Sequence, residues 1–237
     1  MIRISKAETY GWQAAIRGMR NPMNSWGMSD TAYCMDTSDR GTKCKTCIYV
    51  DPENDGSDGG TIVCHNFGEE EALVIGENDL SLMKKLVAAG NDHGKFLRMI
   101  NVTVDVEAPL YWWKEFDTYK VGTVANSCST MHKIQAKEFT LEDFSTDHLS
   151  QTNLIIMKMV IDALNNARLD FLGQKDKRDW WQMIQLLPSS YNQKRTVQLN
   201  YAVLKNIYHA RRNHKLDEWH TFCHFIESLP HSELITE

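Results

Sequence analysis

The spacing of apolar residues divides the chain into an early part rich in strands and a later part rich in helices. Alternating or β-branched runs predict strands at residues 1–9, 44–50, 61–67 and 99–106. Apolar positions at helical spacing predict helices at 10–19, 79–89, 151–172, 177–186, 196–213 and 215–228. A further, aromatic helix is expected to have Pro109 in its first turn. This order of strands and helices indicates an α+β fold.

The helix near residue 80 has a predicted start, face and end. Asn78 or Asp79 is a residue type that caps helices, and Gly90 is expected to stop this one near Ala89. One face of this helix is apolar and consists of Leu80, Leu82, Met83, Leu86 and Val87. The helix is therefore expected to bury one side only.

The sequence contains no internal repeat and no clear interdomain linker. We therefore expect a single domain over residues 1–237, with a cysteine-rich insertion at about 34–67. Within the insertion, residues 51–60 read DPENDGSDGG, which is too acidic and glycine-rich to pack and indicates a hairpin tip.

Composition narrows the class of protein. The chain has 237 residues, 42% apolar and 24% charged, as is ordinary for a globular protein, and its net charge of −5 disfavours nucleic-acid binding. No apolar run approaches the roughly 18 residues of a membrane helix, and the first residues lack the apolar stretch of a signal peptide. We expect a cytoplasmic protein with no membrane contact, in which six cysteines are thiols or metal ligands rather than disulfides.

Four of the cysteines, with His65 beside the last of them, form a possible zinc site. They are Cys34, Cys44, Cys47 and Cys64. Cys44 and Cys47 have the spacing of zinc ligands, and a hairpin would bring Cys64 beside them. No second pair with this spacing follows, so an insertion that carries unpaired thiols is the alternative.

The most informative segment is residues 104–132, VDVEAPLYWWKEFDTYKVGTVANSCSTMH. The run Val106-Glu107-Ala108-Pro109-Leu110-Tyr111, with Lys114 and Phe116 after it, resembles the strand, turn and helix of the flavin-dependent thymidylate synthases. That family continues with an Arg-His-Arg signature and a loop that bears Asn, Ser and Arg-Tyr. Here the signature positions read Thr118-Tyr119-Lys120, the loop keeps Asn126 and Ser129, and Met131-His132 replaces Arg-Tyr.

A second segment resembles the same family. Leu187-Pro188 is followed by Asn200, Leu204, Ile207 and Arg211, in the order that the family shows. The last four residues are spaced by four, three and four, so they lie on one face of a helix. The family's Ala-Gln-x-Glu motif, expected within 215–228, is absent.

The resemblance covers roughly residues 78–229 and implies a central antiparallel sheet with a long helical second half. It also implies an enzyme that converts dUMP to dTMP with methylenetetrahydrofolate, FAD and NADPH, and a homotetramer whose subunits share the flavin sites. Arg211 and Ser129 would be catalytic, and Lys120 and Asn126 would join them in binding the pyrimidine nucleotide. Lys114 and Asn200 would bind the cofactor.

Other interpretations of these residues stay open. Arg211 is also suited to the C-terminus of a helix, Ser129 to a turn, and Lys120 and Lys114 to a solvated surface. The aromatic residues around Trp112 are favoured as core rather than as a stacking platform. Because most charged signature residues are replaced, the chain is alternatively a nucleotide-binding sensor or sequestering protein, or an enzyme acting on another pyrimidine nucleotide.

Overall fold

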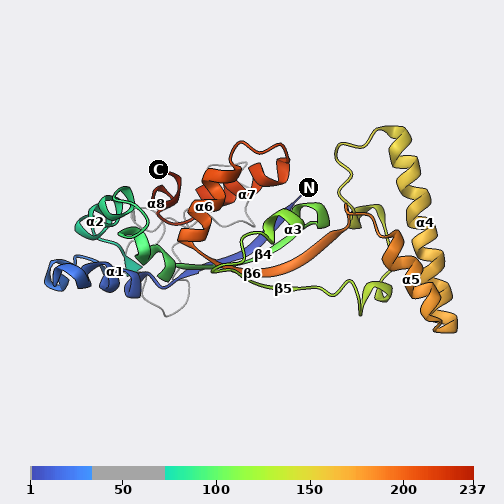
Figure 1. The fold of residues 1–237 in the computed structure, drawn as a ribbon, viewed down its shortest axis with the longest axis horizontal. Coiled ribbons are helices and arrows are strands. Elements are labelled where there is room, and N and C mark those ends of the chain that lie inside the picture. The colour runs from blue at the N-terminus through green and yellow to red at the C-terminus, as the bar shows by residue number, and fades with distance from the viewer. Residues whose placement is uncertain (1, 34–72) are drawn as a thin grey trace, which may run out of the picture. The chain divides into compact units, whose positions relative to one another are not determined.

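The computed structural model describes residues 2–33 and 73–237 (Figure 1). The strands are β1 Arg3–Tyr10, β2 Ala32–Tyr33, β3 Leu73–Val74, β4 Asn101–Pro109, β5 Val124–Ser127 and β6 Asn192–Asn200. The α-helices are α1 Trp12–Arg20, α2 Glu77–Ala88, α3 Leu110–Phe116, α4 Gln151–Gln174, α5 Lys177–Leu186, α6 Tyr201–Arg211, α7 Asp217–Glu227 and α8 Glu233–Thr236. Short 3-10 helices are η1 Asn21–Met23, η2 Trp26–Met28, η3 Gly94–Met99, η4 Ile134–Ala136 and η5 Leu141–Asp143. The predicted α+β class is confirmed.

A four-stranded sheet has the order β1-β4-β6-β5. Its β5 edge is antiparallel to β6, in a register that runs from Val124 opposite Gln198 to Ser127 opposite Arg195. Strands β2 and β3 form a separate antiparallel pair on either side of residues 34–72. The predicted strands 44–50 and 61–67 and the hairpin tip lie outside the described residues.

Strand β4 confirms the prediction made from its β-branched residues. Val102, Val104, Val106 and Ala108 are fully buried, while the residues between them are half-exposed. This period of two gives the strand one buried face. Pro109 ends β4 and immediately precedes α3, so it is the residue before the helix rather than part of its first turn.

The chain divides into two compact units. The first contains Met1–Ala7, Thr103–Gln198 and His214–Phe222, and the second contains Glu8–Val102, Leu199–Asn213 and Cys223–Glu237. The expectation of a single domain stays a prediction. In the first unit, α4 and α5 pack around Leu164 and Met183, both fully buried.

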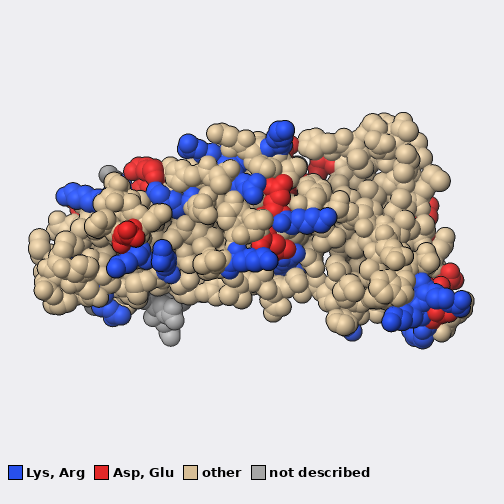
Figure 2. Space-filling view, viewed as in Figure 1, with Lys and Arg blue, Asp and Glu red and all other residues tan. Residues whose placement is uncertain are grey.

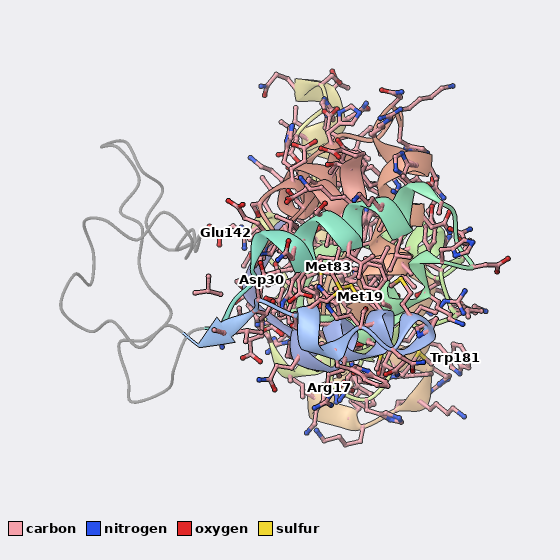
Figure 3. All side chains as sticks on the ribbon, turned by 90° about the vertical axis from the view of Figure 1, so that its left-hand side faces the viewer. Arg17, Met19, Asp30, Met83, Glu142 and Trp181 are labelled. Atoms are coloured by element: carbon pink, nitrogen blue, oxygen red, sulfur yellow. The ribbon has the colours of Figure 1, made fainter. Side chains whose placement is uncertain are left out.

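In the second unit, α1 and α2 bury Met19 and Met83 between them (Figure 3). Met83 is the only fully buried residue of the predicted apolar face of α2; the other four are half-buried. Gly90, with φ of 104°, lies two residues beyond α2 in the left-handed region, as expected for a helix stop.

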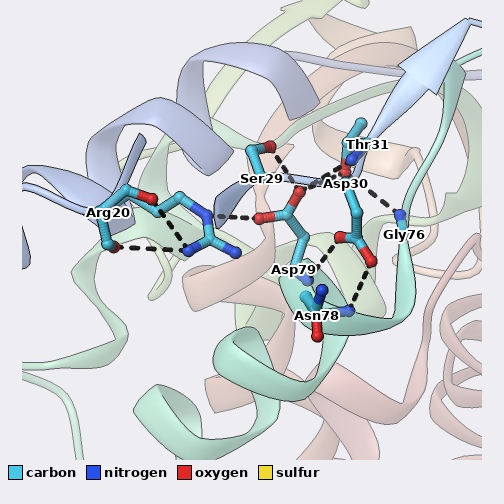
Figure 4. Close-up of polar contacts among 8 residues, drawn as sticks. Arg20, Ser29, Asp30, Thr31, Gly76, Asn78 and Asp79 are labelled. Carbon is cyan, nitrogen blue, oxygen red and sulfur yellow. Dashed lines mark hydrogen bonds and ion pairs between the residues drawn. The ribbon is translucent and has the colours of Figure 1, made fainter. Parts of the chain in front are cut away.

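The start of α2 differs from the prediction, because Gly76 occupies the cap position and Asp79 lies inside the helix. Asp30, from a distant part of the chain, accepts bonds from the Asn78 and Asp79 amides at 2.9 and 3.0 Å (Figure 4). A carboxylate at a helix N-terminus accepts hydrogen bonds from the free N–H groups there and interacts favourably with the positive end of the helix dipole. Gly76 is required here, because a Cβ would lie 2.1 Å from Cγ of Asp30.

The predicted helix 196–213 is wrong in its first part. Residues 192–200 are strand β6, and α6 begins only at Tyr201. Val197 and Leu199 are fully buried at a spacing of two, and backbone pairing with β5 holds this segment extended. The predicted helix starts too early because Lys194, Arg195 and Thr196 interrupt the alternating pattern by which the strand could be recognised.

Candidate functional site

Helix α3 is held in place by its buried aromatic residues. Trp112, Trp113 and Phe116 are almost fully buried, and the Trp112 ring lies 4.8 Å from that of Trp219. The indole N–H of Trp113 donates to the Gln193 carbonyl at 2.9 Å. These rings are core, which confirms the favoured interpretation and leaves them unavailable as a platform for an aromatic ligand.

Polar contacts also connect α3 to residues 214–219. The Tyr111 hydroxyl donates a short hydrogen bond to the buried Glu218 carboxylate. Burial, and then this carboxylate, raise the pKa of Tyr111 well above its usual value. Glu115 accepts from the Trp219 indole at 3.1 Å and lies 3.2 Å from Nε2 of His214. No local pattern indicates this cluster, because its members are more than a hundred residues apart along the chain, 107 for Tyr111 and Glu218 and 104 for Glu115 and Trp219.

A cavity of about 250 Å³ opens where α3 ends and the chain turns toward β5. Its lining residues are Phe116, Asp117, Tyr119, Lys120, Thr123 and Ala125. The segment therefore brings Tyr119 and Lys120 of the altered signature to one cavity, whereas the Thr118 hydroxyl donates back to the Glu115 carbonyl at 2.7 Å. The side-chain oxygen of Thr123 is buried and has no hydrogen-bond partner in the described chain.

Beside this cavity, Asp117 is fixed by an arginine that the sequence did not single out. Nη1 of Arg195 lies 2.7 Å from Oδ1 of Asp117, and its guanidinium carbon lies 4.2 Å from the centre of the Trp113 ring. Its Nε also donates to Oε1 of Gln193 at 3.1 Å. A guanidinium with three such contacts has little freedom, so it holds the carboxylate in one position.

The polar run that contains Asn126 and Ser129 is a strand end followed by a turn. Asn126 is an exposed residue of β5 opposite Thr196. The Ser129 hydroxyl oxygen accepts from the amides of Met131 and His132 at 3.2 and 2.9 Å. The expected turn role of Ser129 is therefore present. Neither residue is among those that line the cavity.

The remaining predicted residues are placed separately. Lys114 is exposed on the last turn of α3. Asn200 and Arg211 belong to the second unit, at the two ends of α6. Oδ1 of Asn200 accepts from the Val203 amide at 3.0 Å, as an N-cap does.

The shared face predicted for α6 is confirmed between those ends, because Leu204 and Ile207 are fully buried. Arg211 is half-buried in the last turn.

The predicted zinc ligands Cys34, Cys44, Cys47 and Cys64 lie outside the described residues. Within residues 2–33 and 73–237 no group of three or more His, Cys, Asp or Glu side chains is arranged to hold a metal ion. Cys128 is exposed, whereas burial and then Glu227 raise the pKa of Cys223 to about 11. None of the helices in the described ranges combines the length and apolar character of a membrane-spanning segment.

Comparison with known proteins gives a result at the level of structure. No family model and no curated protein matches the sequence. A crystal structure of flavin dependent thymidylate synthase ThyX from Helicobacter pylori complexed with FAD and dUMP matches with a TM-score of 0.61 and 15% identity, over 98% of each chain. Another Helicobacter pylori ThyX structure with FAD and dUMP matches with a TM-score of 0.60 and 15% identity, over 100% of this chain and 96% of the other. The chain thus has the fold of the flavin-dependent thymidylate synthases and is structurally related to them.

Proposed function

We propose that the chain is a thymidylate synthase-like enzyme that converts dUMP to dTMP, with methylenetetrahydrofolate as carbon donor, FAD as cofactor and NADPH as reductant. The observation that carries this proposal is the match, over nearly the whole of both chains, to ThyX structures with FAD and dUMP. The cavity supports it, because the Lys120 ammonium can attract a phosphate and the Thr123 hydroxyl, which has no partner among the described residues, can bond to a base.

In this proposal each residue has a limited role. Lys120 attracts the phosphate as a point charge, and Arg211 polarises a pyrimidine carbonyl with its fixed fork of donors. Ser129 accepts two backbone bonds, so its own hydroxyl hydrogen is left for an oxygen of the substrate. Asn126, exposed on β5, offers an amide to the same nucleotide.

The residues present fit part of a flavin rather than all of it. The cavity of about 250 Å³ is smaller than the roughly 300–1,000 Å³ of pockets that enclose drug-sized ligands. It therefore suits a mononucleotide or one end of a dinucleotide. Lys114 and Asn200 are the proposed flavin contacts of this chain, and FAD when bound supplies the hydride-transfer chemistry. A site completed by a neighbouring subunit would supply the remaining contacts.

Self-association has its own support in α4. Four apolar residues on this helix are more than half exposed, namely Ile155, Ile156, Met159 and Leu169. Figure 2 shows that the visible surface over much of α4 carries few charged side chains, with Lys and Arg gathered near its C-terminal end. Exposed apolar stripes of this kind mark protein interfaces. We assign this surface to a second copy of the chain within a homotetramer.

A second candidate function has a specific observation in its favour. The cavity contains the Asp117 carboxylate beside a single lysine, where the family has several cations. This lining weakens the attraction for phosphate. It favours either an enzyme for another pyrimidine nucleotide or a binding homologue that lacks flavin chemistry.

Two measurements test the proposal. Purified protein is expected to show a flavin absorbance spectrum, and to release tritium from C5-labelled dUMP when FAD, NADPH and methylenetetrahydrofolate are supplied. Flavin-loaded protein that binds dUMP but releases no tritium would reject the synthase and support the second candidate. Protein that binds neither flavin nor nucleotide would reject both.

A further inference from the structure

The cavity beside α3 has an uneven distribution of polar groups. Its most buried parts are the ring of Phe116 and the side-chain oxygen of Thr123, which has no partner among the described residues. Its charged groups belong to Asp117 and Lys120, which are exposed. The cavity thus has an apolar interior with one unused hydroxyl, and a charged rim.

The interior suits a planar polar ring. A buried hydroxyl that has lost water without gaining a partner is disfavoured, and a ligand that bonds to it removes this cost. A pyrimidine base offers carbonyl acceptors and a ring N–H donor, so the Thr123 hydroxyl can either donate a hydrogen bond to the base or accept one from it.

The rim suits a sugar and a phosphate in different places. Lys120 attracts an anion. The charge of Asp117 is compensated by Arg195, and its other carboxylate oxygen is left to accept a hydrogen bond. A sugar hydroxyl is the donor that a nucleotide carries between its base and its phosphate.

Asp117 is arranged to select for such a donor. Its side chain is 49% exposed, and its Oδ1 is held 2.7 Å from Arg195, whose side chain is only 14% exposed. Because Arg195 also contacts Trp113 and Gln193, the carboxylate is fixed before any ligand arrives. A fixed acceptor loses little freedom on binding and therefore discriminates well between ligands with and without a donor.

We propose that Asp117 is a specificity-determining residue that accepts a hydrogen bond from a sugar hydroxyl of a pyrimidine nucleotide, whose base contacts Thr123 and whose phosphate lies near Lys120. This inference rests on the proposed function only in taking the ligand to be a pyrimidine nucleotide. It requires no turnover.

Calorimetry with two nucleotides tests it. The wild type is expected to bind dUMP about 10-fold or more tightly than 2′,3′-dideoxyuridine monophosphate, which lacks the sugar hydroxyl. Asp117→Ala removes the acceptor and adds no donor, so the two affinities of the variant are expected to agree within about twofold. Asp170→Ala, an exposed change on α4, is the matched control and keeps the preference.

Thr123→Val tests the proposed contact to the base independently of the contact to the sugar. Valine has a similar shape but no hydroxyl, so both nucleotides are expected to bind more weakly by the same factor. Equal binding of the two nucleotides by the wild type, or a preference for dUMP that survives Asp117→Ala, overturns the inference. The tritium assay tests the enzyme separately. A preference for dUMP over the dideoxy nucleotide without tritium release rejects the proposed synthase activity and supports the inference. No binding of either nucleotide overturns both.

Discussion

Nε of Arg20 lies 2.6 Å from Oδ1 of Asp79, and both side chains are almost completely buried. The other carboxylate oxygen of Asp79 accepts bonds from the Ser29 and Thr31 hydroxyls at 2.7 and 2.6 Å, and from the Thr31 amide at 3.1 Å. Arg20 also donates to the Ser25 carbonyl at 3.2 Å. The pair thus joins the end of α1, the following loop and the first turn of α2.

Removing Arg20 should destabilise the second unit strongly. Arg20→Ala leaves the Asp79 carboxylate buried without its cation, a change that typically costs about 3–5 kcal/mol. The measurement is urea denaturation followed by circular dichroism. Arg17→Ala, an exposed arginine on the same helix, is the control, with an expected change within about 0.5 kcal/mol. Similar losses in the two variants would contradict the assigned role of the pair.

Acid should weaken this network in a defined direction. Burial alone would raise the pKa of Asp79, but hydrogen bonds from Ser29, Thr31 and Arg20 outweigh it and hold the pKa below the ordinary 3.8. A lowered folded-state pKa contributes stability that is fully present above the unfolded-state value and is lost as pH falls toward the folded-state value.

The stability gap between wild type and Asp79→Asn is therefore expected to be constant from neutral pH down to about pH 5, and to narrow below about pH 4. Urea midpoints across this range measure it. Other carboxylates with a lowered pKa, such as Asp143, change the stability of both proteins equally, so their contribution cancels in the difference. A gap that is unchanged at low pH would show that Asp79 does not titrate with folding.

The fold was predictable where one apolar pattern applied without interruption. The run from Val102 to Val106 and the spacing of Leu204 and Ile207 both gave the correct element, because burial of one face decides such segments. Strand β5 gave no signal, since all four of its residues are exposed and only backbone pairing with β6 holds them. Local sequence contains no information about that pairing.

The candidate site was predictable in part for a similar reason. The turn after Pro109 and the signature positions led to Lys120, which lines the cavity. Gln193 and Arg195 were missed because no strand is predicted at residues 187–195, so nothing in the sequence placed their side chains near residues 117 and 128. The contacts that fix Asp117 depend on strand pairing, which a single sequence does not display.

Lys120→Ala should weaken dUMP binding modestly. Lys120 is exposed, and an exposed ion pair is worth about 0.2–1 kcal/mol, or roughly a 1.4- to 5-fold change in affinity. The difference from the wild type should shrink as salt is added, because screening removes the attraction. Lys133→Ala, another exposed lysine of the first unit, should leave the affinity unchanged. An effect that is large and independent of salt would assign Lys120 a buried role instead.

Arg211→Ala should have the larger effect on nucleotide binding. A hydrogen bond from a charged group to a pyrimidine carbonyl is worth about 1.5–3 kcal/mol, which corresponds to roughly 10- to 150-fold in affinity. The neighbouring Arg212 is exposed, so Arg212→Ala is a control for charge near the end of the helix. Calorimetry with dUMP compares the two variants. Equal affinities for both would remove Arg211 from the proposed site.

The exposed face of α4 should control assembly. Ile155 and Met159 are 62% and 65% exposed, and they lie one turn apart on the same side of the helix. Glutamate at both positions would place unpaired charges in an apolar interface, and a two-fold interface contains each change twice, so the cost doubles. Light scattering over a range of concentrations is expected to show the wild type as a tetramer and the double variant as a smaller species with an unchanged circular dichroism spectrum. Gln174→Glu adds charge at the end of the same helix and should leave the tetramer intact. A wild-type monomer, or a double variant that remains tetrameric, would show that subunits associate through another surface or not at all.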